Sequence, residues 1–279
     1  MRFMSSLSIG QFIPGESFIH RLDPRCKIIA TIILMTGLFM ASGIPDFALW
    51  ICLLVIFSTL SGIKLTTILR SGRPVLFLVL ITVVLNLFWT PGSPLVRLGP
   101  LSVTREGLIV ASSMGLRLLF LVIFAGILMM TTSPMAFSDG LERLMSPMAV
   151  LRFPTSEMAM MMTIALRFIP TLFEETDRIL KAQISRGADF ESGGLMRRAR
   201  SFIPILVPLF VLVFQRAENL AVAMESRCYV PGAPRTRMNP LRWSGRDSSA
   251  LACLSVFVLF AIFCDRYVFK IYLTWFAAQ

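Results

Sequence analysis

Long apolar runs are the feature of this 279-residue sequence that most constrains its fold. A helix needs about 20 apolar residues to cross the hydrocarbon core of a bilayer, which is roughly 30 Å thick. We therefore predict an all-α membrane protein with about five transmembrane helices. The predicted spans are Cys26–Gly43, Asp46–Ile63, Pro74–Thr90, Gly107–Thr131 and Ser249–Cys264.

Two further apolar stretches are weaker candidates for spans. Met158–Phe173 is interrupted by Arg167 and Pro170, and Phe202–Phe214 is only about 13 residues long. Runs of that length are more often interfacial or buried in protein than spanning. We therefore predict four transmembrane helices, a non-spanning segment over 133–247 and a fifth transmembrane helix. Seven spans is the alternative.

The composition supports a membrane protein. Apolar residues make up 56% of the chain and charged residues 15%, whereas an ordinary soluble domain is about 25% charged. The mean hydropathy is +0.75. These values exclude a disordered chain and argue against a soluble enzyme. The net charge is +11, and the basic residues that produce it lie between the apolar runs. We therefore expect these residues to contact lipid headgroups and not nucleic acid.

The distribution of Lys and Arg predicts the orientation, because these residues accumulate on the cytoplasmic side of a membrane. With the N-terminus inside, the basic segment 133–247 is also inside, and an odd number of spans puts the C-terminus outside. We predict a cytoplasmic N-terminal elbow (1–25), four transmembrane helices (26–132), a cytoplasmic module of long helices (133–247), and a last transmembrane helix with a short outside tail (248–279).

Helix signals divide the 133–247 segment. Ser133-Pro134 is typical of a helix start, and the helix is expected to run through Leu144. A longer helix is expected from Pro154 to Arg186, followed by Gly187 as a C-terminal cap. A third helix is expected over about Leu195–Arg227.

An internal repeat links the ends of the two long helices. When the chain is displaced by 41 residues, Phe173–Gly187 falls on Phe214–Cys228, and both copies end in Ser-Arg. An Arg in the last turn of one helix is favourable against the helix dipole by about 0.3–1 kcal/mol and needs no further role. Two such ends instead suggest a partner with two equivalent binding sites, such as a dimeric ATPase.

The N-terminal sequence carries a family resemblance. Ile9–Ser17 (IGQFIPGES) and Ile19–Lys27 (IHRLDPRCK) are similar to the N-terminus of EcfT, the transmembrane T component of energy-coupling factor (ECF) transporters, within the broader CbiQ-type family. The paired Ser-Arg ends resemble the family's Ala-Arg-Gly signatures. Ser replaces Ala at 185 and 226, and Cys replaces Gly at 228, which weakens the expectation of a glycine-type cap at the second end.

The resemblance implies a scaffold without enzymatic activity in the bacterial cell membrane. It would join a membrane S component, which binds a vitamin or metal ion, to two cytoplasmic ABC ATPases that bind ATP and Mg²⁺. We expect no cofactor or metal on this chain. The residues expected to contact one ATPase or the other are Ser185, Arg186, Gly187, Ser226, Arg227 and Cys228. The two ends should address the same cytosolic assembly, and ends that point apart would contradict this interpretation.

Methionines are dense in the 133–247 segment. Methionine surfaces adapt to several partners, so one hypothesis is a contact surface for interchangeable S components. The other interpretation is ordinary packing of apolar helices. The residues of the hypothetical surface are Leu144, Met148, Met158, Met160, Met161 and Met162.

Other basic residues have simpler interpretations. Arg117 lies within the fourth predicted span, where we expect it to donate hydrogen bonds to carbonyls of neighbouring spans. Arg197, Arg198 and Arg200 are expected to contact anionic lipid. In the segment before the first span, Asp23 is expected to pair with a nearby arginine.

Two other classes of protein agree less well with the sequence than a coupling subunit does. The permease of a conventional ABC importer would carry a Glu-Ala-Ala-x3-Gly loop, which the sequence lacks. A membrane enzyme acting on lipid would need clustered carboxylates or histidines, but His20 is the one histidine, and the set Glu174, Glu175 and Asp177 is spread over more than one helix face. No GxxxxGK[ST] motif occurs, so we do not expect the chain to be the ATPase.

Overall fold

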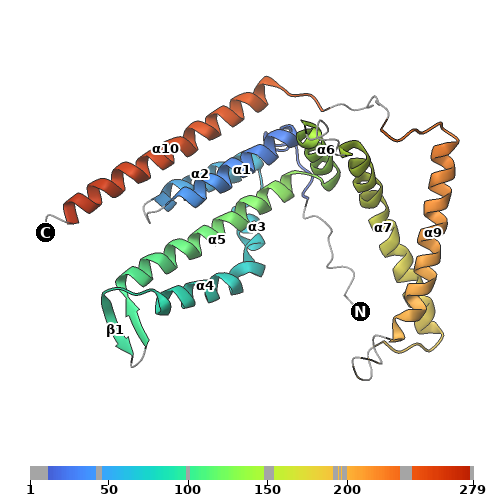
Figure 1. The fold of residues 1–279 in the computed structure, drawn as a ribbon, viewed down its shortest axis with the longest axis horizontal. Coiled ribbons are helices and arrows are strands. Elements are labelled where there is room, and N and C mark those ends of the chain that lie inside the picture. The colour runs from blue at the N-terminus through green and yellow to red at the C-terminus, as the bar shows by residue number, and fades with distance from the viewer. Residues whose placement is uncertain are drawn as a thin grey trace. The chain divides into compact units, whose positions relative to one another are not determined.

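The computed structural model describes residues 12–41, 46–98, 101–147, 154–190, 194, 196, 200–232 and 241–276. Nearly all of the described elements are helices, with one short β-hairpin (Figure 1). The chain forms two compact units. The larger unit contains the described residues through Arg143 and those from Leu241 onward, and the smaller unit contains those between Leu144 and Gly232.

The larger unit contains most of the described helices and the hairpin. α6 reaches the boundary between the units at its last two residues. The elements are α1 (Pro24–Met40), α2 (Asp46–Ser61), α3 (Leu65–Ser71), the 3₁₀ turn η1 (Arg73–Val75), α4 (Leu76–Trp89), β1 (Pro94–Leu98), β2 (Leu101–Thr104), α5 (Arg105–Thr131), α6 (Pro134–Met145) and α10 (Gly245–Phe276).

An aromatic core joins α1, α2, α5 and α10. The Trp50 ring of α2 packs edge-on against Phe124 of α5, with ring centroids 6.0 Å apart. Gly37 of α1 is required here, because a Cβ at this position would lie 2.5 Å from Cγ1 of Val258 in α10. The missing side chain therefore lets the helices approach closely, as small residues do in membrane helix packing.

Arg117 caps the C-terminal end of α1. Its Nη2 donates a hydrogen bond of 2.6 Å to the carbonyl oxygen of Ala41, the C-terminal cap of α1. A guanidinium at a helix C-terminus satisfies an end carbonyl and opposes the negative end of the helix dipole. The predicted hydrogen bond from Arg117 to a neighbouring span is confirmed.

The β-hairpin connects α4 to α5 and was not predicted. Its strands pair antiparallel and are only 5 and 4 residues long. Thr104 caps α5 by accepting a hydrogen bond from the Gly107 amide, and its hydroxyl donates to the Thr90 carbonyl. Because the strands are so short, their alternation of apolar and polar residues is too weak to detect in the sequence.

Five described stretches are long and apolar enough to cross a membrane: Leu65–Trp89, Arg105–Thr131, Thr155–Ser185, Ile203–Glu225 and Gly245–Arg266. The second and last contain the predicted spans Gly107–Thr131 and Ser249–Cys264, and the first contains all of Pro74–Thr90 except Thr90. The other two predicted spans form α1 and α2, which at 17 and 16 residues are shorter than this criterion requires. Length and composition alone therefore do not separate the helices of the smaller unit from spanning helices.

The smaller unit consists mainly of two long helices, α7 (Thr155–Ser185) and α9 (Ile203–Glu225). They lie side by side and run in opposite directions (Figure 1). The Phe190 ring, just after α7, lies 5.7 Å from Phe202, just before α9, and Arg216 of α9 forms an ion pair of 3.7 Å with Glu175 of α7. The observed α7 matches the predicted helix over Pro154–Arg186.

The start of α9 differs from the prediction. A helix was expected from about Leu195, but the helical residues Arg200 and Ser201 are followed by a turn at Phe202. Pro204 explains the interruption, because it has no amide hydrogen to donate to the Arg200 carbonyl and its ring would collide with that carbonyl. Proline is tolerated in the first turn of a helix, so α9 begins here.

Candidate coupling site at two helix ends

The C-terminus of α7 is a Schellman motif. Gly187 has φ of 86°, in the left-handed region, and its amide donates to the Ile184 carbonyl at 2.9 Å. The Ala188 amide donates to the Gln183 carbonyl at 3.0 Å. These two bonds satisfy carbonyls that the end of a helix would otherwise leave without partners. The predicted glycine cap at Gly187 is confirmed.

The C-terminus of α9 has the same geometry with a different residue at the turn. Cys228 has φ of 54°, its amide donates to the Glu225 carbonyl at 2.9 Å, and the Tyr229 amide donates to the Met224 carbonyl at 3.1 Å. The cysteine was expected to weaken a glycine-type cap. The structure instead forms the cap and places a side chain where glycine is normally favoured.

Both repeats present the arginine in the same way. The Ser185 hydroxyl donates to the Lys181 carbonyl and the Ser226 hydroxyl to the Ala223 carbonyl, each at 3.0 Å. Arg186 and Arg227 are exposed, and neither guanidinium forms a hydrogen bond or an ion pair within the described part of the chain. Each helix therefore ends in a cation that is available to a partner.

The two ends do not lie beside each other. Because α7 and α9 are antiparallel, Arg186 lies at one end of the pair and Arg227 lies toward the other, and the two C-termini point in opposite directions (Figure 1). α9 has 23 residues, so at 1.5 Å per residue the two C-termini are about 35 Å apart along the pair. The expectation that the ends point the same way is wrong, because consecutive helices that pack side by side in opposite directions have their C-termini at opposite ends of the pair.

A groove runs between the two helices. It has a volume of about 450 Å³, and apolar side chains of both helices form most of its wall, with Phe168 and Leu172 on α7 and Leu220 and Met224 on α9. Arg216 lies at the wall, where its guanidinium is 5.9 Å from the Phe168 ring centroid. The groove reaches Tyr229, two residues beyond Arg227.

The hypothetical methionine surface lies mostly on the first part of α7. Met158, Met161 and Met162 are exposed, Met160 is partly buried, and Leu144 is partly buried on α6. Met148 lies outside the described residues. Positions 158, 161 and 162 share one helix face, since they are three and four residues apart.

The residues predicted to contact anionic lipid are only partly described. Arg200 is exposed and helical, whereas Arg197 and Arg198 lie outside the described residues. The predicted pairing of Asp23 is confirmed, because its two carboxylate oxygens accept from Nε and Nη2 of Arg25 at 3.1 and 3.0 Å.

Asp247 was missed by the sequence analysis. It is buried at the start of α10, where it accepts hydrogen bonds from the backbone amides of Ser244 and Asp23 at 2.8 and 2.9 Å. The spacing Ser244-x-x-Asp247 before an apolar run is a capping-box signal, and it could have identified this residue. Its contact with the N-terminal elbow could not be read from the sequence, because the two residues are distant along the chain.

Comparison with known proteins gives a consistent family. The sequence profile of CbiQ, described as cobalt transport protein, matches residues 15–238. The chain is 56% identical over 268 residues to the energy-coupling factor transporter transmembrane protein EcfT of Thermanaerovibrio acidaminovorans, covering 96% of this chain and all of the relative. It is 48% identical to EcfT of Clostridium kluyveri, covering 93% of this chain and 97% of the relative.

A more distant relative of the same name extends this result. EcfT of Bacillus subtilis is 39% identical over 261 residues, which cover 93% of this chain and 98% of the relative. The CbiQ match over residues 15–238 includes both Ser-Arg ends. The chain therefore belongs to the CbiQ family, as a transmembrane protein of the energy-coupling factor transporter, EcfT, type.

Proposed function

We propose that this chain transmits motion from two cytoplasmic ABC ATPases to a membrane S component during uptake of a micronutrient. The observation that carries the proposal is the pair of α7 and α9 ends, where one cap geometry occurs twice and each copy presents an arginine without a described partner. Guanidinium groups bind carboxylates and carbonyls with defined geometry. Two equivalent ends fit two equivalent ATPase subunits.

The two ends point apart, which contradicts a partner that receives both arginines at one place, so the proposal is restricted to a partner with two separate binding sites. Its two binding sites must be separated by roughly the length of α9, which is about 35 Å for 23 helical residues. One ATPase would contact Ser185, Arg186 and Gly187, and the other would contact Ser226, Arg227 and Cys228. A dimer with one groove on each subunit meets this requirement, whereas a single groove that receives both arginines does not.

The membrane orientation follows from the same proposal. The α7–α9 pair lies at the cytoplasmic face, the N-terminus is inside and the C-terminus outside, so Arg186 and Arg227 are accessible to cytosolic subunits. The second half of α7 supports this placement, because Lys181 pairs with Asp177 and Arg178 pairs with Glu175 there. Charged pairs at this density are rare at the centre of a bilayer.

Exposed residues of the smaller unit support the proposed contacts with the S component and with anionic lipid. The S component contacts the exposed Met158, Met161 and Met162 of α7, and anionic lipid contacts Arg200. ATP and Mg²⁺ bind to the ATPases, and this chain has no catalytic activity of its own. The alternative, a conventional ABC permease, is not favoured, because the relatives are named for energy-coupling factor transporters and the coupling loop of such a permease is missing.

Co-purification of the ATPases tests the proposal. We expect Arg186→Glu and Arg227→Glu each to reduce the recovered ATPase by at least tenfold, and the double variant to lose ATPase binding and uptake. The control is Arg178→Glu, the same change at an exposed arginine within α7. A double variant that retains ATPase binding and ATP-dependent uptake would refute the proposal.

A further inference from the structure

The start of α1 is the centre of a buried polar cluster in the larger unit, formed by Asp23, Arg25, Lys27 and Asp247 and called the elbow junction below. Asp23, Lys27 and Asp247 are buried, and Arg25 is largely covered. Asp23 and Arg25 form an ion pair, whereas Lys27 donates to carbonyls and Asp247 accepts from backbone amides. Charged groups are rarely buried unless they are paired or hydrogen-bonded.

The contacts of the elbow junction hold three chain segments to the start of α1. The Asp23 amide donates to the Asp247 carboxylate at 2.9 Å, which fixes the first turn of α10. Arg25 donates to the Leu241 carbonyl at 3.2 Å and lies 5.8 Å from the Trp243 ring.

Lys27 makes the third attachment. Its ammonium donates to the carbonyl of Thr131, the last residue of α5, at 2.8 Å. The same ammonium donates to the carbonyl of His20 at 3.1 Å, so the N-terminal elbow is fixed as well. α1, α5 and α10 are therefore joined at one end by specific polar contacts.

These attachments lie where the chain leaves the larger unit and where it returns. The chain leaves through α6, which begins three residues after Thr131 and whose Gly140 is so close that a Cβ there would lie 3.0 Å from Pro24 Cβ. It returns at Leu241 and Trp243, the residues that Arg25 contacts. Both covalent connections to α7 and α9 are thus attached to the start of α1.

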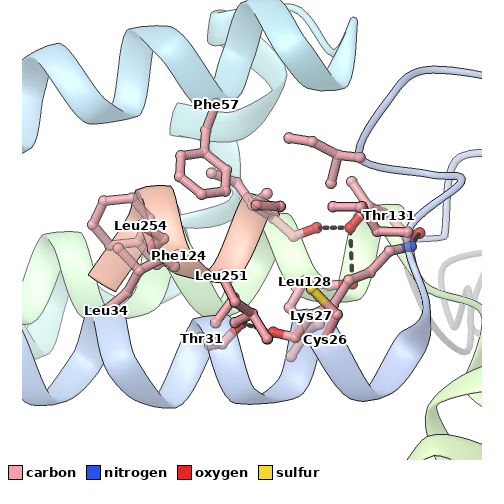
Figure 2. Close-up of a pocket in the computed structure, with 15 residues that line it drawn as sticks. Cys26, Lys27, Thr31, Leu34, Phe57, Phe124, Leu128, Thr131, Leu251 and Leu254 are labelled. Carbon is pink, nitrogen blue, oxygen red and sulfur yellow. Dashed lines mark hydrogen bonds between the residues drawn. The ribbon is translucent and has the colours of Figure 1, made fainter. Parts of the chain in front are cut away.

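Apolar packing is incomplete next to the elbow junction. A cavity of about 80 Å³ lies between α1, α5 and α10. Figure 2 shows Lys27 and Thr131 at one end of the cavity and Leu34, Phe124 and Leu254 at the other. Tight packing normally resists relative movement of helices. The polar contacts of Lys27 lie beside this cavity.

The geometry points to a mechanical role. We infer that the elbow junction transmits displacement of the α7–α9 pair to α1 and α10, and that Asp23, Arg25 and Asp247 are positioning residues for this coupling. The inference rests on the proposed function, because it takes ATP as the source of the movement. A rigid polar attachment transmits force in a defined direction, whereas the neighbouring cavity leaves space for the helices to shift.

The test follows movement inside the larger unit and needs no transported substrate. Cys52 of α2 and Cys253 of α10 are exposed free thiols, so both can be spin-labelled after Cys264 is changed to serine and Cys228 to glycine, the residue of the family signature. Cys26 is left in place, because it is buried and its thiol donates to the Asp247 carbonyl in the elbow junction. The distance between the labels is measured in the assembled complex with the ATPases, in lipid vesicles, with and without ATP and Mg²⁺. ATP hydrolysis is measured on the same samples.

The informative variant is Arg25→Lys, which keeps the charge but cannot hold Asp23 by two parallel bonds while contacting Leu241. The matched control is Arg21→Lys, the same change at an exposed arginine of the elbow that pairs only with Glu16 among the described residues. We expect ATP to change the Cys52–Cys253 distance in the parent and in the control. In Arg25→Lys this change should fall at least threefold, while ATP hydrolysis and complex assembly stay within twofold.

Several outcomes would overturn the inference. A parent complex that hydrolyses ATP without any change in the label distance would do so, as would an Arg25→Lys variant that behaves like the control. A variant that loses assembly and ATP hydrolysis together would show a purely structural role. Asp247→Asn independently tests the attachment of α10 to the start of α1. Failure of the proposed function is distinguishable, because it appears as normal ATPase binding by the Arg186→Glu, Arg227→Glu double variant.

Discussion

In the larger unit, Trp50 and Phe124 are 1% and 2% exposed, whereas in the smaller unit Phe214 is 70% exposed and Met161 is 61% exposed. Within the described residues, α7 contains no buried residue and α9 contains only Ile205. Both units are rich in apolar residues. The larger unit packs many of them against each other, and the smaller unit leaves most of them for lipid or for other subunits.

This difference indicates where partners are needed. A pair of helices cannot enclose a core, so its apolar faces must be covered from outside. Large exposed apolar patches mark protein or membrane contacts. The smaller unit therefore has the surface of an interaction module, whereas the larger unit has an internal core of its own. The following predictions test this contrast, beginning with the largest expected effect.

Truncation of a phenylalanine should cost much more stability in the larger unit than in the smaller one. We expect Phe124→Ala to destabilise the protein by about 3–5 kcal/mol, because it leaves a cavity between Trp50 and Phe120. Phe214→Ala should change the stability of the isolated chain by less than about 0.5 kcal/mol, as expected for an exposed position. Thermal unfolding of both variants in detergent measures the difference. Equal shifts in Tm would contradict the contrast between the units.

Charge at the helix ends should matter more when partners are present. In the isolated chain, Arg186→Glu and Arg227→Glu should each cost only about 1 kcal/mol, because each residue is exposed without a described ion pair and interacts there only with the helix dipole. In the complex, loss of one charge-assisted contact is expected to cost about 2–3 kcal/mol of ATPase affinity. Titration of the purified ATPases onto the chain measures this effect. A large loss of Tm in the isolated chain would instead indicate an internal role.

Arginines within apolar helices should also differ between the units. Arg117→Met removes the cap of α1 and leaves the Ala41 carbonyl without that donor, so a loss of about 1–2 kcal/mol is expected. Arg167→Met, in an exposed position of α7, should have little effect on stability. Chemical unfolding of the two variants compares the positions directly. Equal stability would mean that the Arg117 bond is replaced by another donor.

Local signals in the sequence predicted local structure well. The start of α6 at Ser133-Pro134, the length of α7, and the Gly187 cap were all predicted, because each depends on residues within a few positions of one another. The Asp23–Arg25 pair was predicted for the same reason. The coupling residues were located by the repeat of Ser-Arg and by the family resemblance, and their role remains a prediction.

Features that depend on the folded chain were not predictable in this way. The C-terminal end of α1 is capped by Arg117, a residue of α5 that lies 76 residues further along the chain. The attachment of Asp247 to the Asp23 amide joins segments more than 200 residues apart. The antiparallel pairing that separates Arg186 from Arg227 is a tertiary property, and the repeat gave no information about direction.

The smallest predicted effect compares the two helix ends themselves. Gly187 and Cys228 occupy the same left-handed position, but only glycine adopts it without steric cost. A Cβ at Gly187 would meet no atom within 4 Å, so Gly187→Ala introduces backbone strain alone, about 1 kcal/mol. Cys228→Gly should relieve a similar strain. Hydrogen exchange of the capping amides measures both effects: protection of Ala188 should fall about fivefold and that of Tyr229 should rise by a similar factor. If Cys228→Gly instead lowers the protection of Tyr229, the cysteine side chain stabilises this end through a contact that glycine cannot make, and the two ends are not equivalent.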